Sequence, residues 1–360
     1  MVNIHMMKAF EGDFLWISYG DMENIYHVLV DGGVKACGEK YAKILNEIAD
    51  ANQLVEAIIL THIDCDHIAG VCEGIAKVTP EVLQKVVKRI IFNASEEIHK
   101  EIKVTNSFGG YGVKEGIQFL EILEMKGIKN RLINNVISGQ IITLEDDAVL
   151  KIISPGEKQL IELFDKWERY QEKHDAIGYA CNTDNLKRNL GDLKSALTGT
   201  DNSINNASSI AFLFEYQDVK GAFLADAKPL VCLEGLKKFD IEERYQVDFI
   251  KISHHGSIAN TNLKLLKVLC AENYLLSTDG HGKKTPSKVM IAKLIRNCEE
   301  KNKTKVSIYC NYNWWETIYH NKYFTEVDKK MYIDTRILEM YVLGKDGMNL
   351  KDGLTVYGKR

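Results

Sequence analysis

Residues 61–67, Thr-His-Ile-Asp-Cys-Asp-His, follow directly after the apolar run 57–60, Ala-Ile-Ile-Leu. The run is short and wholly apolar, which is typical of a strand buried on both faces of a parallel sheet. The segment after it carries four side chains that bind metals in other proteins, namely His62, Asp64, Asp66 and His67. This spacing indicates that the end of the strand has a chemical role.

Burying two carboxylates and two imidazoles without compensation costs several kcal/mol, so this segment cannot belong to an apolar core. A divalent cation supplies the compensation, because imidazole and carboxylate are ordinary ligands of Zn, Mn and Fe. An exposed polar loop is the simpler alternative for an isolated pair of such residues. Four of them behind a buried strand favour a metal site.

The same arrangement recurs at three other predicted strand ends. His254 and His255 follow the apolar strand 248–252 and precede Gly256, which lets the backbone approach closely. Asp226 ends the strand 222–225, and Asp31 follows the strand 25–30. A lone Asp after a strand is usually a turn former. Here the four strand ends together predict one shared site.

The rest of the chain predicts a mixed α/β domain. Strands are expected at 13–19, 25–30, 57–60, 149–153, 209–216, 222–225, 249–252, 274–277, 306–309, 337–342 and 354–357, and helices at 41–48, 160–170, 264–270 and 287–297. Residues 217–221 are expected to turn a hairpin. Residues 156–207 are polar and are interpreted as an insertion that covers one end of the domain.

Composition excludes several classes of protein. The chain has 360 residues, 46 Lys and Arg against 50 Asp and Glu, and a formal net charge of −4. An acidic balance argues against coating long duplex DNA or an acidic membrane. Eight scattered cysteines, no basic leader and no apolar run of about 20 residues predict a reduced, cytoplasmic protein that does not span a membrane.

These motifs resemble the metallo-β-lactamase superfamily. Residues 62–67 match its HxHxDH signature in the form HxDxDH, and residues 254–257 resemble its last histidine motif. Asp31 in LVDGG looks like the first motif, and Asp226 looks like the aspartate that bridges two metals. The resemblance implies a four-layer αββα sandwich: residues 1–300 form the hydrolase domain, and residues 301–360 add strands that complete or extend it.

A closer resemblance is to the branch that includes the hydrolase domain of ComEC/Rec2 DNA-uptake proteins. That branch combines an N-terminal Gly-Asp pair, here Gly12 and Asp13, with the HHGS motif. It also has Asn and Ser at the start of a strand, here residues 206–210, and a late His-Pro segment, here residues 281–286. The combination covers residues 6 to 300 and is much more specific for fold than for substrate.

The resemblance also assigns roles to the site residues. His62 would hold a first metal, with Asp64 either as an oxygen ligand or as a base that contacts the bound water. Asp66, His67 and one of His254 or His255 would hold a second metal, with Asp226 between the two. Asp64, Asp66 and His255 are the expected catalytic residues, and the histidine that does not bind metal is a donor to a ligand or a general acid. Asp31 would orient a ligand, Lys251, Lys283 and Lys284 are candidates to meet a substrate anion, and His281 is either a wall of the site or a surface residue.

Two departures from the family pattern weaken the first metal position. Asp64 replaces a histidine, and no histidine occurs between residues 175 and 253, where many members place a third ligand. We therefore expect one or two Zn²⁺ ions, with a first position that tolerates Mn²⁺ or Mg²⁺.

The expected function is that of a metal-dependent hydrolase. Bound metal lowers the pKa of water to about 7 and supplies hydroxide at neutral pH. A phosphodiester is the favoured substrate, as in a nuclease or phosphodiesterase, and single-stranded nucleic acid or a nucleotide suits the acidic balance. The alternatives are hydrolysis of an amide, thioester or lactone bond, and a metal-bound regulatory partner without turnover. The polar segments 156–207 and 311–335 are candidate partner surfaces.

Overall fold

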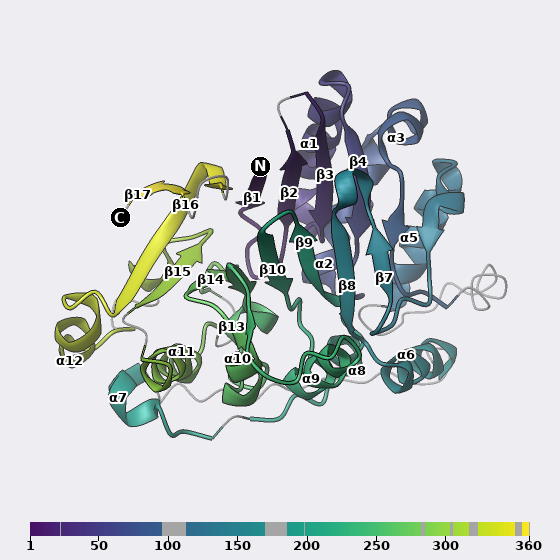
Figure 1. The fold of residues 1–360 in the computed structure, drawn as a ribbon. Helices are drawn as coiled ribbons and strands as arrows, with labels where there is room; N and C mark the ends of the chain where they lie inside the picture. Colours follow the sequence, from purple (N-terminus) through teal and green to yellow (C-terminus); the bar gives the residue numbers. More distant parts are fainter. Residues whose placement is uncertain are drawn as a thin grey trace.

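The computed structural model describes residues 1–21, 23–95, 113–169, 186–197, 199–281, 285–302, 305–316, 323–349 and 355–359. Within these residues, fifteen strands form one hydrogen-bonded sheet (Figure 1). Across the sheet they are β6 (Leu132–Ile133), β5 (Ile90–Ile91), β4 (Leu54–Ile59), β3 (Ile25–Val30), β2 (Leu15–Gly20), β1 (Val2–Met6), β16 (Leu338–Asn349), β15 (Val306–Cys310), β14 (Asn273–Leu276), β12 (Phe249–Lys251), β10 (Val219–Phe223), β9 (Ala211–Tyr216), β8 (Val149–Ser154) and β7 (Ile141–Thr143), with β17 (Thr355–Lys359) paired to β16.

The sheet curls so that its two halves face each other. One buried cluster joins apolar side chains of the β1–β5 half, such as Ile17 and Ile59, to those of the other half, such as Phe212 and Phe249. Side chains alternate between the two faces of a strand, so each half has a second face to cover. The two halves are therefore the inner layers of the molecule.

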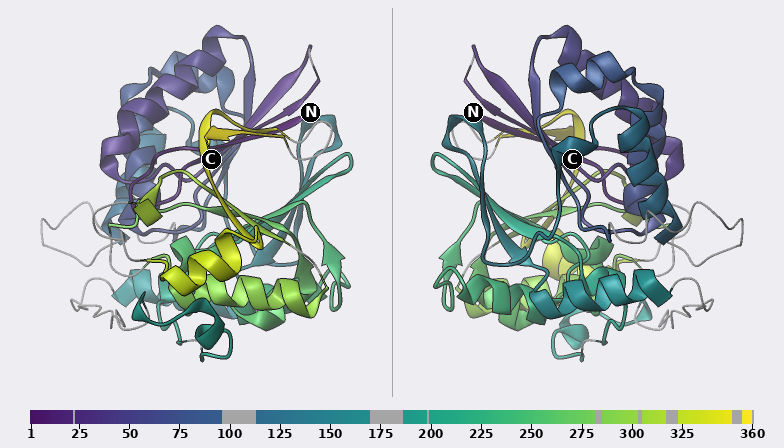
Figure 2. Two further views of the ribbon diagram at one scale, coloured as in Figure 1. Left: turned by 90° about the vertical axis from the view of Figure 1, so that its left-hand side faces the viewer. Right: turned by 90° about the vertical axis from the view of Figure 1, so that its right-hand side faces the viewer.

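Helices cover both outer faces. The outer face of the first half packs against α1 (Gly38–Asp50), α2 (Cys65–Lys77), α3 (Pro80–Val86), α5 (Val113–Met125) and α6 (Glu157–Arg169). The outer face of the second half packs against α7 (Leu190–Leu193), α9 (Pro229–Lys237), α10 (Leu263–Val268) and α11 (Lys288–Glu300). Figure 2 shows the two helical layers on opposite sides of the strands. This is the four-layer αββα sandwich, so the predicted fold class is confirmed.

Several elements differ from the sequence predictions. The strand β1 was not predicted, although its alternating burial fits a strand between two neighbours. The hairpin turn between β9 and β10 is only Gln217 and Asp218, shorter than expected. Helix α6 buries Trp167 in the first outer core, whereas α7 buries Leu190 in the second. The polar segment around residues 156–207 therefore contributes to both helical layers.

Strands β15 and β16 lie inside the sheet order. They connect β14 of the second half to β1 of the first half. Among the helices that the structure describes, none is long and apolar enough to cross a bilayer.

Candidate metal centre

The candidate ligands meet where the parallel strands of both halves end. In the first half β3 runs parallel to β4, and in the second half β10, β12 and β14 are parallel neighbours. Carboxyl ends of parallel strands lie at the same edge of a sheet, so residues after them are neighbours. Asp31 follows β3, His62 follows β4, Asp226 follows β10, and His254 and His255 follow β12.

Four residues at these strand ends have left-handed backbone. The φ angles are 54° for Asp31, 45° for Ala225, 48° for His254 and 51° for His255. Each such conformation costs of the order of 1–3 kcal/mol in a residue other than glycine and clusters at functional sites. The fold therefore carries a conformational cost at the place where these side chains converge.

The His67 ring is oriented by Asp31. The His67 Nδ1 lies 2.7 Å from Asp31 Oδ2, and both side chains are fully buried. Asp31 also accepts hydrogen bonds from the Thr61 backbone N at 2.8 Å and from Thr61 Oγ1 at 2.7 Å. Because Nδ1 donates to the carboxylate, the Nε2 of the neutral ring keeps its lone pair for another partner.

His62 and His255 are fixed in the same way. The Thr61 hydroxyl donates to Asp31, so at 3.0 Å it accepts from the Nδ1 of His62. The Nδ1 of His255 donates to the backbone O of Ser277 at 3.0 Å. The Nε2 of His62 is buried without a hydrogen-bond partner, which is costly for a polar atom unless something else binds it.

Asn260 holds His254. The Asn260 Nδ2 donates to Asp201 Oδ2 at 2.8 Å and to the backbone O of Asp226 at 3.0 Å, so its Oδ1 is available as an acceptor. The Nδ1 of His254 lies 3.0 Å from that oxygen. The Nε2 of His254 then lies 3.6 Å from Asp226 Oδ2.

The free Nε2 atoms and the carboxylates form two groups that share Asp226. The first, half-site A, contains Asp66, His67 and His255: Asp226 Oδ1 is 3.5 Å from His67 Nε2 and 3.7 Å from His255 Nε2. Asp66 Oδ2 lies 3.5 Å from the same His255 atom. The His67 and His255 Nε2 atoms are 3.2 Å apart. Two lone pairs at this distance repel, so a cation between them is favoured.

The second group, half-site B, is made of His62, Asp64 and His254, which lie near Asp226 Oδ2 or near one another only in pairs. The ligand atom of His62 that lies within 4.8 Å of two other candidate ligands at once does so with His67 and Asp226. The Nε2 of His62 is 3.6 Å from Asp64 Oδ2 and 3.8 Å from Asp226 Oδ2. Both candidate histidines of the last motif lie beside Asp226, with His255 in half-site A and His254 in half-site B.

The electrostatics also suit a cation. Burial alone lowers the pKa of His67, but Asp226, Asp31 and Asp66 outweigh burial and raise that pKa well above its usual value. Burial raises the pKa of Asp226, but the surrounding histidines outweigh it and hold that pKa well below the usual range. Asp226 therefore stays ionised and attracts either protons or metal to the imidazoles. Mixed imidazole and carboxylate sets of this kind fit Zn²⁺ or Mn²⁺.

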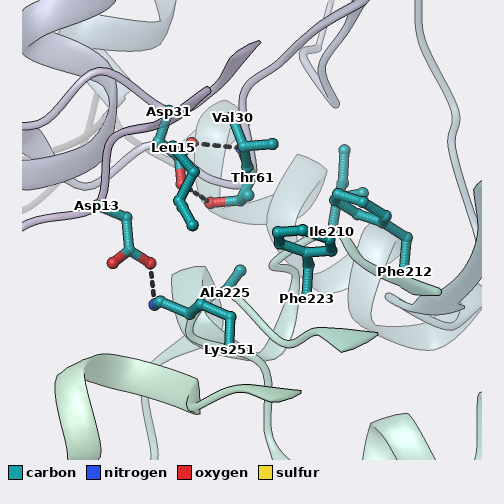
Figure 3. A pocket seen from close by; sticks show the side chains of 10 residues that line it. All are labelled: Asp13, Leu15, Val30, Asp31, Thr61, Ile210, Phe212, Phe223, Ala225 and Lys251. Atoms are coloured by element: carbon teal, nitrogen blue, oxygen red, sulfur yellow. Dashed lines mark hydrogen bonds and ion pairs between the residues drawn. The ribbon is translucent and has the colours of Figure 1, made fainter. Parts of the chain in front are cut away.

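Lys251 lies behind the ligands. Its ammonium forms an ion pair with Asp13, and both side chains are only 1% exposed (Figure 3). The pair lies beside a cavity just large enough for one water molecule, which Asp31 and Thr61 also line. Asp13 Oδ1 is 3.5 Å from His255 Nδ1. This burial corrects the expectation that Lys251 meets a substrate anion.

Other predicted residues lie elsewhere. The His281 side chain is half exposed and lies 3.3 Å from Asp279 on the loop after β14. Lys283 and Lys284 are outside the described residues. Gly12 packs against helix α2, where a Cβ would lie 1.8 Å from the backbone O of Asp66. The Gly-Asp pair therefore allows the N-terminal loop to approach half-site A.

Sequence reasoning missed three polar residues of the site. Asn205 donates from Nδ2 to Asp64 Oδ1, Asn260 holds His254, and Asp201 accepts from Asn260. Asn205 and Asn260 are 2% and 1% exposed. Polar residues in a polar segment are usually solvated, and only their closeness to strand β9 and to the HHGS motif is a signal in the sequence.

Comparisons with known proteins find remote similarities. No family model matches the chain. A segment of 127 residues is 26% identical to hydroxyacylglutathione hydrolase of Psychromonas ingrahamii, and it covers 35% of this chain and 44% of that protein. The metallo-β-lactamase fold protein YhfI of Bacillus subtilis is 11% identical, with 99% of each chain covered and a TM-score of 0.41. A diphosphatase of the PhnP family is 11% identical, with 96% of this chain and 86% of that chain covered and a TM-score of 0.38.

The matched segment spans less than half of the hydroxyacylglutathione hydrolase. The assignment of the fold therefore depends on the molecule itself. Two facing sheet halves, two outer helical layers and a site at the strand ends are the architecture of the metallo-β-lactamase fold. The closer resemblance to the ComEC/Rec2 branch stays a prediction.

Proposed function

We propose that this protein is a metal-dependent hydrolase. The observation that carries the proposal is the set of four imidazoles that face shared carboxylates with Nε2 while their Nδ1 atoms are held by protein oxygens. Each ring is thereby fixed in orientation and tautomer, as in metal sites whose ligands are supported by further hydrogen bonds. Half-sites A and B would each hold one cation, with Asp226 offering one oxygen to each.

When bound, such cations polarise the oxygen of the scissile bond and lower the pKa of a neighbouring water. The side chains of the protein would orient the ligands and accept the proton that this water releases. Asp64 is suited to receive it, because its Oδ1 accepts from Asn205 while its Oδ2 lies 3.6 Å from the Nε2 of His62 and the side chain is 29% exposed. Asp31 and Ser277 keep the rings of His67 and His255 in place. Asp66 and His255 would act as ligands of half-site A.

A phosphodiester is the proposed substrate class. Two cations that share a carboxylate suit displacement at phosphorus, because they stabilise both the attacking and the leaving oxygen. The motif order, with Asp64 in the second position, also supports this class. Thioester hydrolysis is the second candidate, favoured by the segment that is similar to hydroxyacylglutathione hydrolase.

Elemental analysis of the purified protein beside Asp66→Ala tests the metal site. We expect one to two equivalents of Zn or Mn in the wild type and a loss in the variant. The matched control is Asp50→Ala, at an exposed position on α1. A wild-type protein that neither contains nor binds Zn²⁺ or Mn²⁺ would contradict the proposal.

Turnover then separates the substrate classes. We expect hydrolysis of bis-p-nitrophenyl phosphate by the metal-loaded wild type and by Asp50→Ala, but not by Asp66→Ala. Turnover of a hydroxyacylglutathione with none of the phosphodiester supports the second candidate. Full metal occupancy without turnover of phosphodiesters, thioesters, amides or lactones supports a regulatory role.

A further inference from the structure

Residues 201–206 connect the polar segment before β9 to half-site B. Asp201 Oδ1 accepts from the Ser203 backbone N at 2.8 Å, and Ser203 caps the short helix α8 (Ile204–Ala207) by accepting from the Asn206 N at 3.2 Å. This local geometry fixes Asn205 and Asn206 at the end of the turn, where both side chains are buried.

Residues 201–206 support two residues of half-site B, namely Asp64 directly and His254 through Asn260. Asn205 donates to one oxygen of Asp64, so Asp64 has a single oxygen left to face His62. On the other side, Asp201 Oδ2 accepts from Asn260 at 2.8 Å, and Asn260 accepts from His254 Nδ1 at 3.0 Å. Asn206 donates to the same Asp201 oxygen at 2.8 Å.

Charge strengthens the contact with Asp64. The ammonium of Lys166 on α6 lies 2.9 Å from Asn205 Oδ1. A cation on the oxygen of an amide makes its N–H groups better donors, and hydrogen bonds in a chain polarise one another. Lys166, Asn205 and Asp64 thus form one line that ends at half-site B.

Half-site A is oriented without this turn. Its His67 is held by Asp31, and its His255 is held by Ser277. The two half-sites share Asp226 but have separate supports. Loss of one support should therefore affect one cation more than the other.

We propose that residues 201–206 and Asn260 are positioning elements that decide whether half-site B holds a metal ion. The proposal rests on the proposed function and deepens it. It accounts for a second cation in a ligand set where Asp64 stands in place of a histidine. The amide of Asn205 fixes Asp64 as an oxygen donor, and the amide of Asn260 fixes the imidazole of His254; these two side chains would take the places of two conventional histidine ligands. Removing a partner that orients a ligand typically weakens metal affinity by 10–100-fold.

The test is metal stoichiometry, measured by native mass spectrometry at limiting free Zn²⁺. We expect two equivalents in the wild type and one in Asn205→Leu and in Asn260→Leu, with the second equivalent bound 10–100-fold more weakly. Asn202→Leu, at an exposed position in the same turn, is the control and keeps two. The retained equivalent in half-site A shows that each variant is folded.

Lys166→Met is a milder variant that leaves both amides in place. We expect it to weaken the second equivalent by a smaller factor than Asn205→Leu. Two equivalents of unchanged affinity in both amide variants would overturn the inference, and so would a wild type that binds a single equivalent. The proposed function survives either of these results. A wild type that binds none contradicts the proposed function itself.

Discussion

At the scale of residues, the site is defined by where the protons of its imidazoles lie. Each Nδ1 lies at hydrogen-bond distance from an oxygen of the protein: Asp31 for His67, Thr61 for His62, Asn260 for His254 and Ser277 for His255. The Nε2 atoms are left to face Asp64, Asp66 and Asp226. The protein thus orients the Nε2 atoms toward the carboxylates before any cation binds, which reduces the ordering that binding requires.

The variant Asp31→Asn tests whether the orientation of His67 by Asp31 contributes to metal affinity. Asp31 accepts from three donors, and an asparagine replaces one of its oxygens by an NH₂ group that opposes a donor. We expect metal affinity to fall by 10–100-fold, measured by competition with a chelator at fixed pH. Asp50→Asn on the exposed face of α1 is the control. An affinity equal to that of the control would show that Asp31 does not orient His67.

The buried Lys293 on α11 makes the stability of the fold depend on pH, at a position away from the candidate metal centre. Its side chain is buried, and burial together with Arg296 lowers its pKa from 10.5 to about 8. The unfolded state therefore binds more protons than the folded state above pH 8, and the stability cost of the charged lysine is present below pH 8 and relieved as pH rises toward 10.5.

We expect Lys293→Met to stabilise the protein at pH 7 by about 1–3 kcal/mol, and this gain to shrink between about pH 8 and pH 10. Urea unfolding at each pH measures the difference from the wild type. Lys264→Met, at an exposed position on α10, should show no such trend. A gain that stays constant with pH would contradict the assigned pKa.

The candidate ligands were identified from the sequence, but most of the residues that contact and orient them were not. Four candidate ligands are adjacent in residues 62–67, and the others follow apolar strands. Asn205 and Asn260 act across loops, so nothing in their sequence spacing reports the contact. The burial of Lys251 was predictable from the sequence. Lys251 stands two residues after Phe249 in a strand, so both side chains lie on the same face, and Phe249 belongs to the core between the two halves.

At the scale of elements, close backbone contacts fix the first helix of the site. The N of Gly32 donates to the O of His67 at 2.9 Å, and the N of Gly70 donates to the O of Gly33 at 2.9 Å. A Cβ on Gly70 would lie 1.9 Å from the O of Gly32. The loop after β3 can therefore approach helix α2 closely enough to place Asp31 beside His67 only because Gly32 and Gly70 have no side chains.

The variant Gly70→Ala should push the loop after β3 away from helix α2, because the added Cβ would collide with the backbone O of Gly32. We expect it to lower the free energy of unfolding by about 2 kcal/mol or more in urea, and to reduce metal content as Asp31 moves away from His67. Gly199→Ala is the matched control, because the nearest atoms to its Cβ would be at ordinary contact distances of 3.8 and 3.9 Å. Equal metal content in the two variants would show that the loop can shift without disturbing the site.

At the scale of the whole molecule, the candidate metal centre lies between two halves that are also joined by an apolar core and by strands β15 and β16. Asp66 and His67 come from the first half, and Asp226 and His255 come from the second. A cation bound by both halves therefore stabilises their association and binds the folded state alone.

Metal removal should therefore lower the thermal stability of the entire domain. At a free Zn²⁺ concentration of 100 times Kd, one site adds about 2.7 kcal/mol, which corresponds to a rise in Tm of several degrees for a domain of this size. Asp226→Ala should show almost no rise, because it removes a ligand from both half-sites. Differential scanning calorimetry with and without Zn²⁺ measures this, and an equal rise in both proteins would place the stabilising ion elsewhere.

Most strands that build the layers were predictable, because their apolar periodicity is local, but the helices α2, α3 and α9 were not predicted. The pairing of the halves was not predictable. The C-terminal strands were expected to complete or extend the domain, and only tertiary contacts reveal that β16 lies beside β1, with Asn3 opposite Asn349. Loop closure across the entire chain has no local sequence signal.

This pairing has a consequence for synthesis on the ribosome. Translation begins at the N-terminus, so every candidate ligand, the last being His255, has been made before β15 and β16 exist. Until those strands are made, β14 and β1 lack the neighbours that join them, and both expose unpaired edges. The nascent chain therefore has a complete set of ligands on two halves that are not yet connected through the sheet. Metal captured at that stage would join the halves before the last strands arrive.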